Sequence, residues 1–394
     1  GGREMGKAVA DTLRVGAAFD DLRTFIAACR EADHWRVIEG ADWDREIGAL
    51  VEATAELIPE PPLLLFEKIK GYPAGCSVVS LLTASCKRAA LALGLPLERS
   101  KLELVRLAAR KVQAARPIPP ITVPTGPVME NVPITVPTGP VMENVQGGEE
   151  ADVLQFPVLR FHAQDGGRYI GTGDVLINRD PETGFLNMGT YRMQVHERNL
   201  LGLWMSPGQH GRLVCQRYWD RGESCPVVAA FGIDPLLFMA SHTKIPWGKP
   251  ELDFAGGLRE RPVEVIRGPV TGLPIPAHAE IAIEGEVPPP SVEAREEGPF
   301  GEWPGYYSGG TLGTGEPQPV IRVKALYYKS NPVLADEAPM WPGAPKYALP
   351  IWAGTRGGDP AALRGARQAG GARRAELRRD GAQRPLRRHR GRGH

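Results

Sequence analysis

A proline-rich segment at residues 117–146 divides this chain of 394 residues into parts with different hydrophobic patterns. Proline fixes its own backbone angle and lacks an amide hydrogen, so regular structure is interrupted there. Apolar residues upstream recur at helical spacing around one short strand-like run, residues 63–66, which predicts an α/β domain. Residues 151–328 contain runs with apolar residues at alternate positions, such as 281–287, which are typical of strands. We therefore predict an α+β multidomain protein whose central part is a barrel or sandwich.

The proline-rich segment contains an exact repeat. Residues 120–132 recur without change as residues 133–145. Two copies cannot form a solenoid, which needs at least three units to bury a core. We expect one copy to be structural and the other to form an extruded loop. Residues 117–150 are thus predicted to link an N-terminal domain, residues 1–116, to the central domain.

The last 42 residues, 353–394, differ from all that precedes them. They contain 12 arginines, no lysine, three acids and no Val, Ile, Phe, Tyr, Trp or Met. Such a segment cannot build a packed core. A disordered basic tail that contacts nucleic acid and an out-of-frame translation both explain it, and the abrupt change favours the frameshift. The tail carries +9, so the remaining chain carries 1 − 9 = −8 and lacks a basic footprint for nucleic acid.

The apolar runs and the cysteines limit the classes of protein to which this chain can belong. No apolar run approaches the roughly 18 residues of a membrane span, and no apolar signal core follows the N-terminus, so we expect a cytoplasmic protein. The five cysteines fit neither a CxxC metal pattern nor a dense disulfide framework, and we expect reduced thiols.

Two glutamates, Glu297 and Glu302, flank the sequence Gly-Pro-Phe-Gly. Residues five apart do not share a face of a helix or a strand, but a bend rich in glycine and proline can bring them together. Proximity and burial split the pKa values of paired carboxylates, so that one is charged while the other delivers a proton. Alone, the pattern is more often a solvated loop.

Three segments together resemble the UbiD family of prenylated-flavin decarboxylases: residues 187–195, 206–212 and 297–307. The resemblance runs in collinear order from about residue 21 to about residue 351. It implies a split β-barrel that binds flavin at residues 151–328. It also implies non-oxidative, reversible decarboxylation of an aromatic, hydroxybenzoate-like or α,β-unsaturated acid. The expected partners are that acid, a flavin prenyltransferase that supplies the cofactor, and further copies in a homo-oligomer.

The resemblance assigns catalytic roles to Arg192, Glu297 and Glu302. A guanidinium can bind a carboxylate with two hydrogen bonds, so Arg192 is expected to hold Glu297 ionised and to orient the substrate acid. Glu302, less well paired, is expected to keep its proton and to replace the departing carbon dioxide with it.

The resemblance also assigns a divalent metal, manganese or magnesium, to Asn187, His210 and Glu251, bridging to the cofactor phosphate. An amide oxygen, an imidazole and a carboxylate form a mostly hard set that suits such ions. A monovalent cation such as potassium is implied as well. Its ligands would be the carbonyls of Met188 and Ala240 with Ser241 and Thr243.

The flavin is expected against two neighbouring strands and the metal ligands. The implied contacts are Asn187, Met188, Gly189, Thr190, Tyr191, Arg192, Leu203, Trp204, Met205, Gln209, His210 and Glu251. Core packing is an equally natural interpretation for Leu203 and Met205. The sequence has no GxGxxG or P-loop pattern, so metal and side chains would have to hold the phosphate.

Members of the family continue into a third domain that supplies subunit contacts and a lysine to the cofactor phosphate. Here residues 329–352 are predicted to begin that domain, and residues 353–394 replace the rest. We therefore expect a truncated or frameshifted C-terminal region, weak cofactor retention and poor oligomerisation. A non-catalytic remnant that binds flavin or metal remains an alternative, and a basic-tailed nucleic-acid protein a third.

Overall fold

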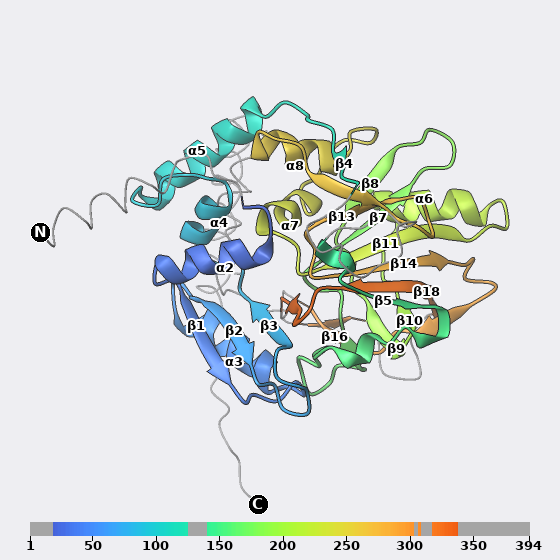
Figure 1. Ribbon diagram of the computed structural model, residues 1–394, viewed down its shortest axis with the longest axis horizontal. Helices are drawn as coiled ribbons and strands as arrows, with labels where there is room; N and C mark the ends of the chain where they lie inside the picture. Colours follow the sequence, from blue (N-terminus) through green and yellow to red (C-terminus); the bar gives the residue numbers. More distant parts are fainter. Residues whose placement is uncertain (1–18, 125–139, 303–305, 309–316, 338–394) are drawn as a thin grey trace, which may run out of the picture.

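The computed structural model describes residues 19–124, 140–302, 306–308 and 317–337. The N-terminal part is an α/β unit (Figure 1). Its elements are α2 (Leu22–Glu31), β1 (Trp35–Glu39), α3 (Glu46–Leu57), β2 (Leu63–Glu67), β3 (Ser77–Ser80), α4 (Cys86–Ala92) and α5 (Lys101–Ala114). Capping boxes start two of its helices, α2 at Asp21 with Thr24 and α5 at Ser100 with Glu103. The predicted α/β character of this region is confirmed.

The last strand of the N-terminal sheet comes from far along the chain. The sheet order is β1-β2-β3-β19, and β19 (Val333–Ala335) runs parallel to β3. The sequence predicts that these residues begin a C-terminal domain, whereas in the structure they belong to the N-terminal sheet. A strand of three residues carries no local signal for the sheet that it joins. The residues after 337, including the predicted tail at 353–394, lie outside the described residues.

The central part is an open half-barrel, in agreement with the predicted split β-barrel. Its sheet has the order β6-β9-β10-β18-β14-β11-β7-β8, and β15 and β5 also pair with β18. The strands are β5 (Asn144–Gly147), β6 (Arg168–Tyr169), β7 (Asp174–Arg179), β8 (Leu186–Gly189), β9 (Gln194–Glu197), β10 (Leu200–Gly202), β11 (Cys225–Phe231), β14 (Ile281–Val287), β15 (Ala294–Glu296) and β18 (Pro317–Tyr328).

Shorter elements complete this part. They are β4 (Ile121–Thr122), η1 (Pro140–Met142), η2 (Gly148–Glu150), η3 (Val153–Gln155), α6 (His210–Trp219), α7 (Pro235–Ser241), α8 (Glu251–Arg259), β12 (Glu264–Arg267), β13 (Pro274–Pro276), β16 (Phe300–Gly301) and β17 (Tyr307–Ser308). In Figure 1, α7 and α8 lie between the N-terminal unit and the half-barrel. No helix in the described ranges is both long and apolar enough to cross a bilayer.

The proline-rich segment contributes to two sheets. The start of the first repeat copy forms β4, which pairs with β12. The end of the second copy forms η1 and the start of β5, which pairs with β18. The structural role is therefore divided between the copies. Residues 125–139, where an extruded copy was expected, lie outside the described residues.

The two parts share their hydrophobic cores. Alternate residues of one strand face different cores: on β2, Leu63 and Leu65 face one and Leu64 and Phe66 the other. Strand β7 divides in the same way. All five cysteines are free and four of them are buried, as expected of reduced thiols. Because both cores span the two parts, the N-terminal unit packs as an integral part of the molecule.

Helix α3 approaches the central part very closely at Gly48. A Cβ atom there would overlap the carbonyl oxygen of Phe161 and lie 2.8 Å from its Cα. The amide of Arg45, just before α3, donates to the carbonyl of Arg160 at 2.8 Å. The absence of a side chain at Gly48 therefore permits a direct contact between backbones.

Gly48→Ala is expected to lower the free energy of unfolding by about 1–2 kcal/mol. Overpacking costs about 1–3 kcal/mol, and the better helix propensity of alanine recovers at most about 1 kcal/mol. Chemical denaturation of the full chain measures this difference. Gly147→Ala is the control, because nothing lies within 4 Å of a Cβ at that glycine. Equal stability of the two variants would contradict the close contact.

Candidate active site

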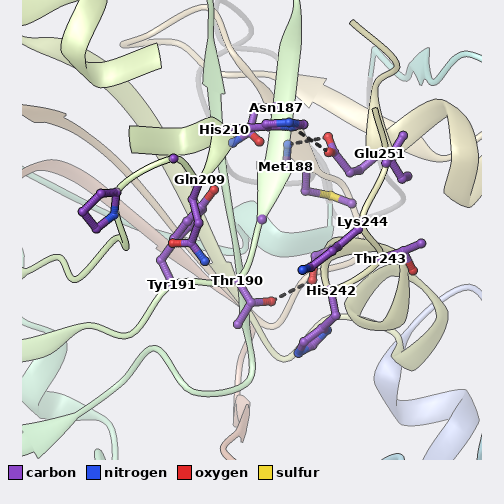
Figure 2. A pocket seen from close by; sticks show the side chains of 15 residues that line it. Asn187, Met188, Thr190, Tyr191, Gln209, His210, His242, Thr243, Lys244 and Glu251 are labelled. Carbon is purple, nitrogen blue, oxygen red and sulfur yellow. Dashed lines mark hydrogen bonds and ion pairs between the residues drawn. The ribbon is translucent and has the colours of Figure 1, made fainter. Parts of the chain in front are cut away.

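One cavity gathers the predicted metal ligands. It has a volume of about 570 Å³ and lies where β8 ends and where α6 and α8 begin. Asn187, His210 and Glu251 all line it, although gaps of 23 and 41 residues separate them in the sequence. Figure 2 shows these three side chains near one end of the cavity, with Thr190 and His242 toward the other.

Hydrogen bonds orient these ligands. The amide of Met188 donates to Glu251 Oε2 at 3.0 Å, and Glu251 Oε1 lies 3.8 Å from His210 Nδ1. Asn187 Nδ2 donates to Asn178 Oδ1 at 3.0 Å, which leaves Asn187 Oδ1 available as an acceptor. A carboxylate, an imidazole and an amide oxygen can therefore converge on one hard cation.

Burial sets the electrostatics of this cavity. It raises the pKa of Glu251 to about 7 and lowers the pKa of His210 below its usual value.

No group of three or more His, Cys, Asp or Glu side chains in the described part of the chain could hold a metal. The set at the first cavity has two such side chains, His210 and Glu251, and its third member is the amide side chain of Asn187.

A second cavity, of about 420 Å³, adjoins the first and contains Arg192 and Glu302. Trp204, Phe300 and Tyr306 supply aromatic walls. The residues common to both cavities are Thr190, Tyr191, Gln209 and His242. The end of the first cavity that contains Asn187, His210 and Glu251 is therefore continuous with a partly aromatic space.

The bend at residues 298–301 brings both glutamates onto Arg192. Its guanidinium donates to Glu297 from Nε at 2.6 Å and from Nη2 at 2.8 Å. Nη1 donates to Glu302 Oε1, which also accepts from Ser308 Oγ at 2.7 Å. The guanidinium lies 4.5 Å from the ring centroids of both Trp204 and Phe300. Two carboxylates and two rings thus fix one buried cation.

The two glutamates differ in access to the cavity. The side chain of Glu297 is 5% exposed and lines neither cavity, whereas that of Glu302 is 18% exposed and lines the second. Burial raises the pKa of Glu297, against the lowering effect of Arg192. Burial therefore acts against the expectation that Arg192 holds Glu297 ionised. Arg192 donates two hydrogen bonds to Glu297 and one to Glu302, and of the two glutamates Glu302 is the one that reaches a cavity.

Tyr191 packs in the space that two glycines leave. A Cβ atom on Gly189 would lie 2.7 Å from its hydroxyl oxygen, and one on Gly211 would lie 2.6 Å away. The amide of Gly211 donates to the same hydroxyl at 2.9 Å. The contact fixes the start of α6, and therefore His210, against the strand that carries Asn187.

Other predicted contacts differ in their placement. Leu203 and Met205 are buried in the core and line neither cavity, which favours the core-packing interpretation. Met188, Ser241 and Thr243, from the proposed potassium site, line the first cavity, whereas Ala240 is fully buried.

Several lining residues were missed by sequence reasoning. They are Lys244 and His242 in the first cavity and Thr172, Phe300 and Tyr306 in the second. The sequence contains one signal for Lys244. This residue directly follows Thr243 and is close to Ser241, which were both expected to bind potassium.

Arg192→Ala is expected to lower the free energy of unfolding by about 3 kcal/mol at pH 7, because it leaves the buried Glu297 without its partner. The loss should shrink as the pH falls, since protonation of a buried carboxylate with a raised pKa removes the unpaired charge. Urea unfolding at several pH values measures both effects. Arg295→Ala, at a more exposed arginine, should cost less than about 1 kcal/mol. A pH-independent loss would contradict this assignment.

Two family models match the chain. The model of the 3-octaprenyl-4-hydroxybenzoate carboxy-lyase Rift-related domain (UbiD) matches residues 134–341, and that of the N-terminal domain of the same family matches residues 26–110. Together they cover the half-barrel and most of the N-terminal unit.

Curated relatives agree with this match. A pyrrole-2-carboxylic acid decarboxylase from Pseudomonas aeruginosa is 32% identical over 322 residues, which cover 80% of this chain and 60% of the relative. A phenolic acid decarboxylase from Streptomyces sp. is 32% identical over 325 residues, covering 80% of this chain and 63% of the relative. The chain thus spans less than two thirds of the length of these relatives.

Solved structures share the fold. The vanillic acid decarboxylase from Sedimentibacter hydroxybenzoicus in its closed form has a TM-score of 0.74 at 26% identity, with 85% of this chain and 67% of that chain covered. An evolved dimeric form of the UbiD-class enzyme HmfF from Pelotomaculum thermopropionicum, in complex with prFMN, has a TM-score of 0.71 at 29% identity, with 86% and 71% covered. The domain matches, the relatives and the fold agree, and the chain belongs to the UbiD carboxy-lyase family.

Proposed function

We propose that this chain decarboxylates an aromatic or α,β-unsaturated carboxylic acid without oxidation, using a prenylated flavin and with Glu302 as the proton donor. The observation that carries the proposal is the continuity of the two cavities. Arg192 and Glu302 line one, the trio of Asn187, His210 and Glu251 lines the other, and Thr190 is among the residues that line both.

The residues present fit a flavin mononucleotide. Asn187, His210 and Glu251 at the first cavity would suit a manganese or magnesium ion, which would help to hold a cofactor phosphate, and Lys244 would add a positive charge beside them. The aromatic walls of the second cavity suit planar rings. When bound there, a prenylated flavin would supply an acceptor for the electrons that remain when carbon dioxide departs. A flavin prenyltransferase is the proposed source of this cofactor.

The protein residues would position the acid and deliver the proton. The guanidinium of Arg192 is the cation in the second cavity that can attract the substrate carboxylate, and Trp204 and Phe300 flank it. When the bond to the carboxylate breaks, carbon dioxide leaves without the electron pair of that bond, which stays with the rest of the substrate and the acceptor that the cofactor would supply. Glu302, which faces this cavity, then transfers a proton to the carbon that carried the carboxylate and is reprotonated from solvent.

An aromatic substrate is our preference. The flanking rings favour a flat molecule by stacking. Relatives named for pyrrole-2-carboxylic, phenolic and vanillic acids support the same class. We propose a hydroxybenzoate-like acid as the first compound to assay. We also retain the expectation that assembly into a homo-oligomer is impaired in this chain.

Mn²⁺ is expected to stabilise the full chain, and His210→Ala should remove most of that effect. An ion present at 100 times its Kd stabilises a protein by about 2.7 kcal/mol. Thermal unfolding and electron paramagnetic resonance of bound Mn²⁺ measure the change. His278→Ala is the control, because that imidazole pairs with Glu264 and lines neither cavity. Equal Mn²⁺ binding by the two variants would remove His210 from the ligand set.

Glu302→Gln is expected to lower turnover at least about 100-fold while FMN still binds, because the amide cannot donate the required proton. Release of carbon dioxide from a panel of aromatic acids, after coexpression with a flavin prenyltransferase, measures turnover. Glu223→Gln, at an exposed glutamate, is the control. Unchanged turnover would refute Glu302 as the donor. A wild-type chain that binds FMN and Mn²⁺ but releases no carbon dioxide would favour the non-catalytic alternative.

A further inference from the structure

The turn that carries the two glutamates is fastened to the segment of residues 162–169. The amide of Gly301 donates to Asp165 Oδ1 at 3.0 Å. The amide of Gly166 donates to the carbonyl of Pro299 at 2.7 Å. Since Gly301 immediately precedes Glu302, the side chain of Asp165 fixes the backbone from which the proposed proton donor extends.

A separate set of contacts holds the beginning of the same turn. The amide of Gly298 donates to Gln194 Oε1 at 3.0 Å. The hydroxyl of Tyr169 donates to the carbonyl of Gly298 at 3.3 Å, and its ring lies 4.4 Å from that of Phe300. The amides at the two ends of the turn therefore have different acceptors: Gln194 for Gly298 and Asp165 for Gly301. An experiment that measures each amide separately can distinguish the two ends.

His162 extends the fastening into the N-terminal unit. Its Nε2 lies 2.7 Å from Glu52 Oε1 on α3, and its amide donates to Asp165 Oδ2 at 2.8 Å. Its ring lies directly against Gly301, where a Cβ would come within 2.6 Å of Nδ1. A chain of contacts thus connects Glu52 and His162, which are half-buried, with Asp165 and Gly301, which are buried.

Helix α3, which carries Glu52, is itself held against the central part by backbone contacts. Helix α3 meets residues 160 and 161 through the backbone contact at Gly48 and through the bond from the Arg45 amide. A displacement of α3 would therefore move Glu52 relative to His162. The contact between the side chains of Glu52 and His162 is thus a second connection between α3 and the segment that begins at residue 160.

We propose that Glu52, His162 and Asp165, named here the turn clamp, are positioning residues that set the placement of Glu302 from the N-terminal unit. The inference rests on the proposed function, because it supposes that Glu302 is the proton donor. None of the three residues lines either cavity, so they would act through the turn and not on the substrate.

The charges around His162 favour its protonated form. Burial opposes that form, but Asp165 and Glu52 outweigh it and raise the pKa of His162 to about 9. Tyr307 on β17 faces the ring edge-on, and Arg160 donates to the carbonyl of Asp165 while its guanidinium lies 3.5 Å from Asp44. With a raised pKa, the stabilisation is complete below the ordinary value of 6.5 and is lost as the pH rises through about 9.

Hydrogen exchange tests the clamp without any assay of activity. In Glu52→Gln, the amide of Gly301 is expected to exchange at least about tenfold faster, while the amide of Gly298, held by Gln194, exchanges at its wild-type rate. Exchange resolved to single residues in the full chain provides both rates. Glu56→Gln, at an exposed glutamate one turn along α3, is the matched control. Unchanged exchange at Gly301 would overturn the inference.

Asp165→Asn provides a second variant, because it retains the shape of the side chain but loses one acceptor oxygen. It should also accelerate exchange at Gly301 and not at Gly298. Equal acceleration at both amides would indicate general loosening of the turn and would overturn the specific role of the clamp.

The pH profile of turnover provides the functional readout. The alkaline decline of kcat is expected near pH 9 in the wild type and at lower pH in Glu52→Gln, with KM and FMN affinity unchanged. An identical profile in both proteins would overturn the positioning role. If the wild type releases no carbon dioxide while exchange at Gly301 still responds, the clamp is supported and the proposed function fails.

Discussion

The site depends on one buried guanidinium that two carboxylates share. Arg192 is inaccessible to solvent over most of its surface, and an unpaired charge there would be costly. The bidentate bond to Glu297 compensates this charge, and the rings of Trp204 and Phe300 enclose it. Because Glu297 and Glu302 reach the guanidinium from the two ends of one bend, the pair also determines the conformation of that bend. Glu302 is thereby held at the wall of the second cavity.

At the opposite end of the site, hydrogen bonds and close packing likewise fix the side chains. The amide of Met188 and the side chain of Asn178 orient Glu251 and Asn187, respectively. Tyr191 then fits between two glycines and fixes the start of α6, where His210 lies. The elements that carry the site are thus held by backbone contacts and by buried side chains. A flexible surface loop would not give such a constant arrangement.

Sequence reasoning found the long and regular elements but missed short pairings. The alternating residues 281–287 are β14, and the region upstream of the proline-rich segment, where apolar residues recur at helical spacing, contains α2, α3, α4 and α5. By contrast, β19 joins the N-terminal sheet, and β4 and β5 arise from different copies of the repeat. Strands of two to four residues are specified by the partner that they meet, and local sequence does not contain that partner. Lys244 and Thr172 were missed as lining residues for a similar reason, since the cavities that they line are formed by segments that are distant in the sequence.

The sequence by itself determined the family, through three collinear segments, and the residue types from which a site could be built. It also identified the pair of glutamates and the bend between them. Only the tertiary structure decided that Glu302 lines a cavity while Glu297 is buried and lines neither, because access depends on packing from distant segments. It also decided that the N-terminal unit reaches the turn of residues 298–301 through Glu52 and His162, residues 110 positions apart that folding brings to within 2.7 Å.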